Sequence, residues 1–62
     1  MKNNIAVIRK QKGLSQKQLA EKVGIGNDWL CDIEKGKGTP SLPLAKTIAE
    51  KLGVKIRDIF LD

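Results

Sequence analysis

The sequence contains no histidine, a single cysteine and only two aromatic residues, Trp29 and Phe60, among its 62 positions. Without histidine, the chain lacks the side chain that most often acts as a general base or a transition-metal ligand near neutral pH. The single cysteine, Cys31, cannot form an internal disulfide, which excludes a small secreted protein held together by disulfides. We therefore expect a protein that is not an enzyme and that uses no metal or cofactor.

Long hydrophobic runs are lacking as well. No apolar run approaches the roughly 18 residues that a membrane-spanning helix needs. Met1–Asn3 leads directly into polar sequence, without the apolar stretch of a signal peptide. We expect a cytoplasmic protein associated with the bacterial nucleoid, with no membrane partner and no evident small-molecule ligand. Its length allows one small domain, residues 1–62.

Positive charge is in excess. Twelve Lys and Arg residues against seven Asp and Glu residues give a net charge of +5 and a pI near 9.7. Such a balance suits a polyanionic partner such as nucleic acid. It is equally compatible with a charge that only keeps a small protein soluble.

Glycine and proline residues divide the chain into segments whose apolar residues have helical spacing, and no segment shows the alternation of a strand. Ser15 and Gln18 form a capping box that opens one helix, and Ser41 can cap another with Pro43 in its first turn. The pattern predicts a compact all-α domain of five helices. These cover about residues 5–12, 16–23, 27–35, 42–52 and 56–60.

The join between the second and third expected helices is the most informative feature. The second helix ends at Gly24, the single apolar residue Ile25 follows, and the third helix begins within two residues. Helices joined so tightly cross steeply, and Ala20 is small enough to let the third helix approach. The spacing predicts a helix-turn-helix whose second helix can lie in the DNA major groove. An ordinary pair of antiparallel helices would show similar spacing.

The motifs around this join closely resemble the Xre/Cro/cI-type helix-turn-helix family. They are QKQLAEKVGI at residues 16–25, IEKGK at residues 33–37 and PSL at residues 40–42, and the resemblance extends over nearly the whole chain. The resemblance implies a lambda-repressor-like domain with the helix-turn-helix in helices two and three. It also implies a homodimer that binds double-stranded DNA at a two-fold operator, and repression of phage or mobile-element type.

The resemblance implies roles for individual residues. Gly26, Asn27, Asp28 and Asp32 are expected to contact bases, because the third helix presents them, with Cys31, opposite its apolar face. The residues expected to contact DNA phosphates are Gln16, Lys17, Trp29, Lys35 and Lys37. The amide of Gln16 matches a family position beside a phosphate, and the Gly36 and Gly38 loop could aim its lysines and its own amides at phosphates.

Two further pairs are expected to have structural roles. Arg9 and Glu34 match a family ion pair that links the first helix to the third, so we expect both to be structural. Ile56 and Leu61 are apolar residues near the C-terminus with no obvious internal partner. We expect them to form a small two-fold contact between subunits.

The third helix departs from the family pattern because it is acidic. Asp28 and Asp32 lie four residues apart, share a face and repel phosphates, although a carboxylate can accept a hydrogen bond from cytosine. One interpretation is discrimination between bases. The alternative is a protein-interaction module, similar to an antitoxin or anti-repressor, that uses the same fold and binds DNA weakly. Cys31 could be a redox handle, but a small side chain at a tight contact is the preferred interpretation.

Overall fold

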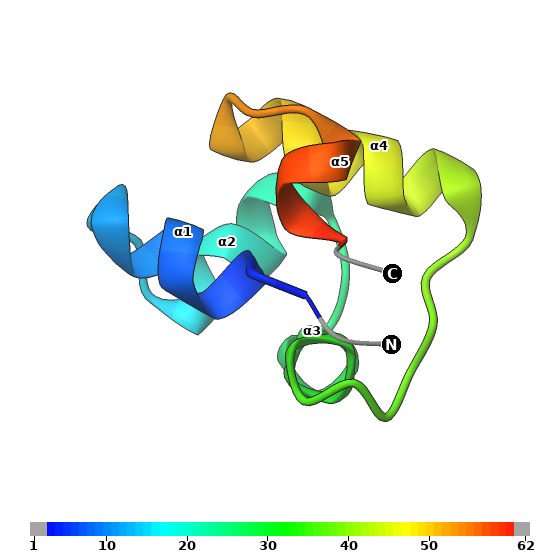
Figure 1. Ribbon diagram of the computed structural model, residues 1–62. Helices are drawn as coiled ribbons and strands as arrows, with labels where there is room; N and C mark the ends of the chain where they lie inside the picture. Colours follow the sequence, from blue (N-terminus) through cyan, green and yellow to red (C-terminus); the bar gives the residue numbers. More distant parts are fainter. Residues whose placement is uncertain (1–2, 61–62) are drawn as a thin grey trace.

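The computed structural model of the protein describes residues 3–60, which contain five helices and no strand (Figure 1). The helices are α1 (Ile5–Gln11), α2 (Gln16–Val23), α3 (Asn27–Glu34), α4 (Leu42–Leu52) and α5 (Ile56–Ile59). A single antiparallel bridge pairs Asn3 with Phe60. The all-α class and the five expected helices are confirmed. Three of the helices, α1, α3 and α5, end one residue earlier than predicted.

Local signals in the sequence set the helix ends. The Ser15 hydroxyl accepts from the Gln18 backbone N–H at 3.0 Å, and the Gln18 side chain accepts from the Ser15 N–H at 2.7 Å. This is the predicted capping box, which satisfies two donors that the start of α2 would otherwise leave unpaired. α2 ends at Gly24, whose φ of 89° lies in the left-handed region that glycine adopts without strain.

α5 begins without the side-chain cap that starts α2. Lys55 precedes it and has no side-chain acceptor, so the Asp58 carboxylate accepts from the Lys55 backbone N–H at 3.0 Å. The same turn is tied to the start of α1, because the Asn4 N–H donates to the Ile59 carbonyl at 2.7 Å. Segments from the two ends of the described chain therefore lie side by side (Figure 1).

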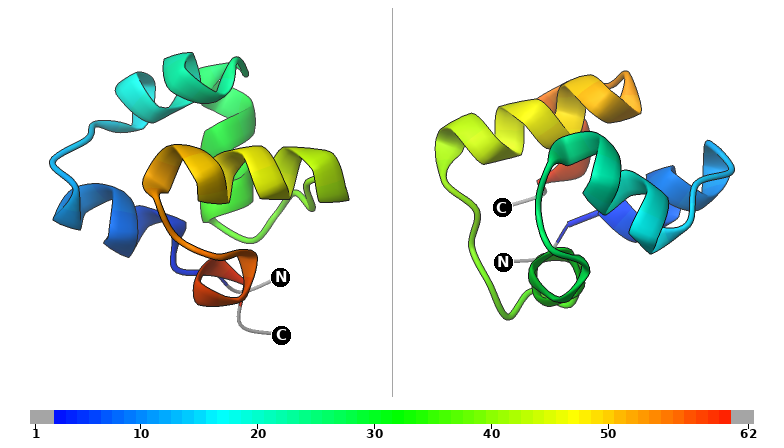
Figure 2. Two further views of the ribbon diagram at one scale, coloured as in Figure 1. Left: turned by 90° about the horizontal axis from the view of Figure 1, so that it is seen from above. Right: turned by 180° about the vertical axis from the view of Figure 1, so that it is seen from behind.

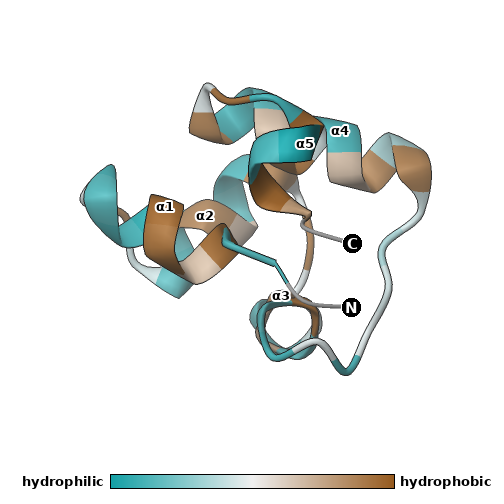
Figure 3. Cartoon of the chain, in the orientation of Figure 1, coloured by the Kyte–Doolittle hydropathy of each residue, from teal (hydrophilic) through white to brown (hydrophobic). Residues whose placement is uncertain are grey.

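The hydrophobic core draws on every helix. Figure 3 shows that α1 is apolar in its N-terminal half and polar at its C-terminal end. Six large side chains in the core are fully buried. They are Ile5, Leu19, Leu30, Ile33, Ile48 and Ile59. Because α2 and α3 each contribute to this one core, its packing fixes the angle at which they meet.

Within residues 3–60, none of the helices has the length and apolar character required to cross a lipid bilayer.

The capping box generates a first prediction. Ser15→Ala should lower the free energy of unfolding by about 1 kcal/mol, because the Gln18 N–H loses its acceptor. Such a loss should lower the Tm of a domain of this size by roughly 4–8 °C in a circular-dichroism melt. Glu21→Gln, at an exposed position of the same helix, is the control. Equal melting of the two variants would show that the cap does not hold α2.

Candidate nucleic-acid interface

The turn between α2 and α3 is short, and backbone hydrogen bonds tie its first two residues to α2. The Gly24 and Ile25 N–H groups both donate to the Ala20 carbonyl, at 2.8 and 3.0 Å. Ile25 packs against the core from the turn, and Ala20 is buried with 2% of its surface exposed. In Figure 2, left, α2 and α3 meet at a steep angle. The residues of this segment thus form a helix-turn-helix, as the spacing predicts.

α3 has one buried face and one exposed face. Leu30 and Ile33 are completely buried in the core, whereas Asn27, Asp28 and Asp32 are exposed. Gly26 is exposed just before the helix, and Cys31 is partly buried. The residues predicted to contact bases therefore lie on the surface of α3 and are available to a ligand. Their contacts with DNA stay a prediction.

A buried ion pair joins α1 to the end of α3. Arg9 Nε donates to Glu34 Oε2 at 2.9 Å, and a second guanidinium nitrogen donates to Glu34 Oε1 at 3.2 Å. The side chains of Arg9 and Glu34 are 10% and 7% exposed. A third nitrogen donates to the Leu14 carbonyl at 2.9 Å, which ties the loop before α2 to the same group. The pair is bidentate and shielded from solvent, so its geometry constrains both helices.

Gln16 joins this pair, a contact that the sequence analysis missed. Its side-chain Nε2 donates to Glu34 Oε1 at 3.2 Å, so Glu34 accepts from both α1 and α2. Gln16 is half-buried rather than fully exposed. The amide nitrogen carries two hydrogens, and the contact with Glu34 uses one of them. The predicted phosphate contact is therefore compatible with the structure, and Glu34 fixes the direction of the amide.

The segment after α3 corrects one expectation. The backbone N–H groups of residues 35–38 were expected to be available to phosphates, but all four donate to carbonyl oxygens of α3. Lys37 and Gly38 share the Asp32 carbonyl, at 2.9 and 3.1 Å. These bonds complete the C-terminal end of the helix, as helix ends generally require. The side chains of Lys35 and Lys37 remain exposed, together with Thr39, which the sequence analysis did not single out.

Trp29 lies against this segment. A Cβ atom placed on Gly38 would lie 2.8 Å from Cη2 and 3.3 Å from Cε3 of the indole, and closer still to Cζ3. The ring thus occupies the space that a side chain at position 38 would need. Trp29 retains 38% of its surface exposed, so part of the side chain is open to solvent.

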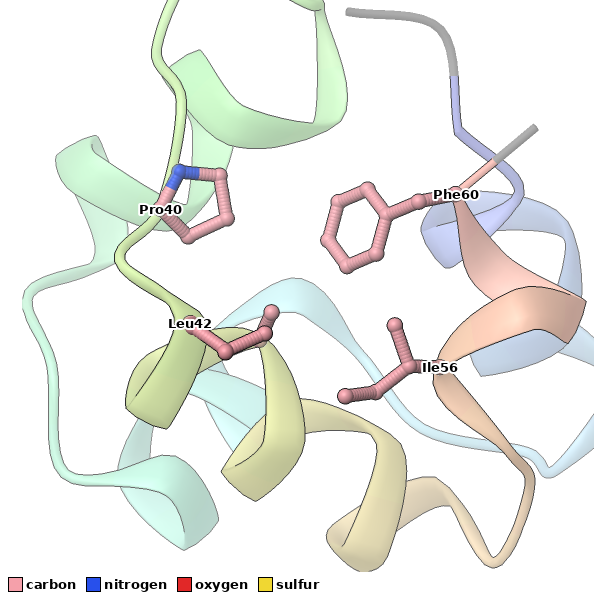
Figure 4. Close-up of a pocket in the computed structure, with 5 residues that line it drawn as sticks. Pro40, Leu42, Ile56 and Phe60 are labelled. Atoms are coloured by element: carbon pink, nitrogen blue, oxygen red, sulfur yellow. The ribbon is translucent and has the colours of Figure 1, made fainter. Parts of the chain in front are cut away.

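The structure changes the expectation for the dimer contact, which named Ile56 and Leu61. Ile56 packs against the core, so the expectation that it lacks an internal partner is wrong. Leu61 lies outside the described residues. Among residues 3–60, the most exposed large apolar side chain is Leu42 at the start of α4, with 73% exposure. It borders an apolar hollow of about 230 Å³ that Pro40, Ala45, Ile56 and Phe60 also line (Figure 4).

Exposed charges of both signs occur on α3 and on the helices and segments before and after it in the sequence. Six exposed lysines occur on α1, on α2 and in the segments that follow α1 and α3. They are Lys10, Lys12, Lys17, Lys22, Lys35 and Lys37. The described residues contain no cluster of three or more acidic, histidine or cysteine side chains that could hold a metal ion.

Comparison with known proteins gives consistent matches. A model of the helix-turn-helix family matches residues 5–59. An uncharacterised HTH-type transcriptional regulator of Methanocaldococcus jannaschii is 48% identical over 98% of this chain and 92% of its own length. The immunity repressor protein of Bacillus phage phi105 is 40% identical over 89% of this chain, which covers 38% of the repressor.

A solved structure extends the likeness to three dimensions. The structure of SinR from Bacillus subtilis, a master regulator for biofilm formation, in complex with DNA has a TM-score of 0.81 to this chain and 33% identity. The match covers 87% of each chain. The lambda-repressor-like fold that the sequence motifs imply is therefore confirmed, and the family is one of transcriptional regulators, not enzymes.

The ion pair generates a second prediction. Glu34→Ala should cost about 3–5 kcal/mol, because it leaves the buried Arg9 guanidinium without its counter-charge. For a domain this small, that loss should unfold most of the protein at 25 °C, as urea titration followed by circular dichroism would show. The double variant Arg9→Met with Glu34→Leu should recover a large part of the stability. A loss below about 1 kcal/mol in Glu34→Ala would contradict the structural role of the pair.

Proposed function

The chain belongs to the helix-turn-helix family of DNA-binding transcriptional regulators, and we propose that it is a sequence-specific repressor of phage or mobile-element type. In this proposal, residues 1–62 form one domain that acts as a homodimer on a two-fold DNA operator. The relative named as a phage immunity repressor supports the repressor part. SinR, whose structure was solved in complex with DNA, supports double-stranded DNA as the ligand.

One observation carries the proposal: α3 is fixed on its inner face while its outer face is free. The core holds Leu30 and Ile33, and Glu34 accepts hydrogen bonds from α1 and α2. The exposed face carries Asn27, Asp28 and Asp32. A helix held in this way can enter the major groove without changing shape, which is the geometry of a recognition helix.

The base contacts are proposed from the chemistry of these side chains. The Asn27 amide can form two hydrogen bonds with the edge of adenine, whereas Asp28 and Asp32 can accept only from a donor such as cytosine N4. The carboxylates would repel guanine O6 and N7, because these atoms are also acceptors. We expect the half-site to contain adenine and cytosine opposite α3, with discrimination that comes partly from repulsion.

The phosphate contacts are proposed for residues at both ends of the helix-turn-helix. Gln16 and Lys17 lie in the first turn of α2, where unpaired N–H groups and the helix dipole favour an anion. Lys35 and Lys37 follow α3, and the indole N–H of the partly exposed Trp29 is a further donor in this proposal. Contacts of this type set the position of a protein on DNA and add affinity that falls with salt.

The dimer contact is proposed for the surface around the apolar hollow. Leu42 lies beside a recess that Ile56 and Phe60 help to line, and Leu61 is the residue after Phe60 in the sequence. A two-fold axis through this surface would seat Leu42 of each subunit in the hollow of the other, which a self-complementary contact requires. Two recognition helices would then read half-sites about 34 Å apart.

Selection from a random duplex pool tests the function directly. We expect enrichment of a two-fold site, with affinity that falls steeply as salt rises because phosphate contacts release counterions. No enrichment, with weak binding that salt removes uniformly, would contradict sequence-specific recognition. That result would favour the protein-interaction module, for which the acidic surface of α3 would be the docking face.

A third prediction separates the two classes of DNA contact. Gln16→Ala should weaken binding to all duplexes by a similar factor, because it removes a phosphate contact. Asn27→Ala should cost about 1–3 kcal/mol on the selected site and relax the preference for adenine at one position. Fluorescence-anisotropy titrations on the selected duplex and on single-base variants would measure both. Unchanged affinity and preference in both variants would contradict the docking described above.

A fourth prediction concerns the dimer. Leu42→Lys should convert the protein to a monomer in sedimentation equilibrium while leaving its far-UV circular-dichroism spectrum unchanged, because the side chain is 73% exposed and outside the core. Val7→Lys is the matched control, since Val7 is also an exposed apolar residue, at 55%, on a different helix. If Leu42→Lys and Val7→Lys sediment alike, the hollow is not the subunit contact.

A further inference from the structure

We propose that Trp29 is a positioning residue, which holds the segment after α3 so that Lys37 meets a DNA phosphate. The inference rests on the proposed function and deepens it. The positioning role of the indole is separate from the phosphate contact proposed above for its N–H group.

The first step is the packing of the ring on Gly38. The indole carbons Cη2 and Cε3 lie 2.8 and 3.3 Å from the place where a Cβ of residue 38 would be. Gly38 has a negative or extended φ in this structure, unlike Gly36 with its φ of 79°, so the backbone does not demand glycine there. The need for glycine at position 38 is therefore steric, and it comes from Trp29.

The second step is the effect of this packing on Lys37. Two glycines flank Lys37, and such a segment would sample many backbone conformations if nothing held it. Two restraints act on it here. The N–H groups of Lys37 and Gly38 both bond the Asp32 carbonyl, and the indole lies against Gly38 from the side. The hydrogen bonds hold the backbone of the turn on α3, and the ring occupies the space beside Gly38 into which the segment could otherwise move.

The third step is the location of Trp29 on the helix. The ring is outside the hydrophobic core cluster and more than one third exposed, so burial alone does not account for it. It stands three residues before Asp32, whose carbonyl the loop bonds, and on the same helix that would enter the groove. The helix that would contact bases thus also carries Trp29, which holds the segment with Lys37 in place. The base contacts and the phosphate contact therefore keep a fixed position relative to each other.

Double-mutant cycles on the selected duplex test this role. Lys37→Gln should lower the affinity several-fold and reduce the salt slope by about one. In a Trp29→Ala background, Lys37→Gln should lower it by less than about two-fold, because the lysine has already lost its fixed position. Lys17→Gln, on α2, should give the same loss in both backgrounds. A residue that only stabilised the fold would not couple selectively to Lys37 or alter the salt slope.

Gly38→Ala provides a second variant that keeps the indole. The added methyl group should push the ring and the loop apart, which should reproduce the loss of coupling to Lys37. It should also shift the fluorescence of the only tryptophan in the protein without DNA. In the Trp29→Ala background, Gly38→Ala should have little further effect on affinity.

The outcomes are distinguishable. Equal losses for Lys37→Gln with and without Trp29, in a protein that binds its selected duplex, would overturn the positioning role and leave the proposed function intact. Unchanged fluorescence in Gly38→Ala would overturn the contact on which the role depends. A protein that enriches no duplex at all would overturn the proposed function itself, and the DNA part of this inference would fall with it.

Discussion

The buried carboxylate of Glu34 is the group on which the arrangement of the first three helices depends. It accepts from Arg9 on α1 and from Gln16 on α2 while it belongs to α3. A charge in this position has little access to water, so it is tolerable only when its partners are correctly placed. The requirement works in both directions, because any shift of α1 or α2 would leave polar atoms unpaired. Hydrophobic packing brings these helices together, and Glu34 selects one relative orientation.

Much of the fold was predictable because its signals are local. Ser15 with Gln18, Ser41, and the glycines at 24 and 53 act within a few residues of their own position, and the helix ends followed them to within one residue. The ion pair of Arg9 with Glu34 was available only through resemblance to a family. Residues 25 positions apart share no local pattern that would pair them.

Most of the features that the sequence analysis missed are contacts between segments that lie apart in the sequence. Gln16 on α2 donates to Glu34 at the end of α3. Ile56 packs against the core, although its position near the end of the chain did not indicate any core neighbour. The amides of residues 35–38 were predicted to be free because the segment contains two glycines, whereas the end of α3 uses all four. The contact of Trp29 with Gly38 was also not predicted. The contacts of Gln16, Ile56 and Trp29 depend on which segment packs nearby, which composition and spacing do not encode, whereas the four amides follow from the local closure of a helix end.

The attachment of α3 is unequal along its length. Its last turn is held from three directions, since the Asn3 side chain donates to the Ile33 carbonyl at 2.7 Å while Arg9 and Gln16 both bond Glu34. Its first turn has no side-chain cap, and Gly26, Asn27 and Asp28 are all exposed. The C-terminal turn of α3 is therefore held by hydrogen bonds from other segments, whereas its N-terminal turn is exposed. Substitutions at Gly26, Asn27 and Asp28 would alter the DNA sequence that the protein recognises without disturbing its fold. The sequence specificity can therefore diverge in evolution while the fold stays the same.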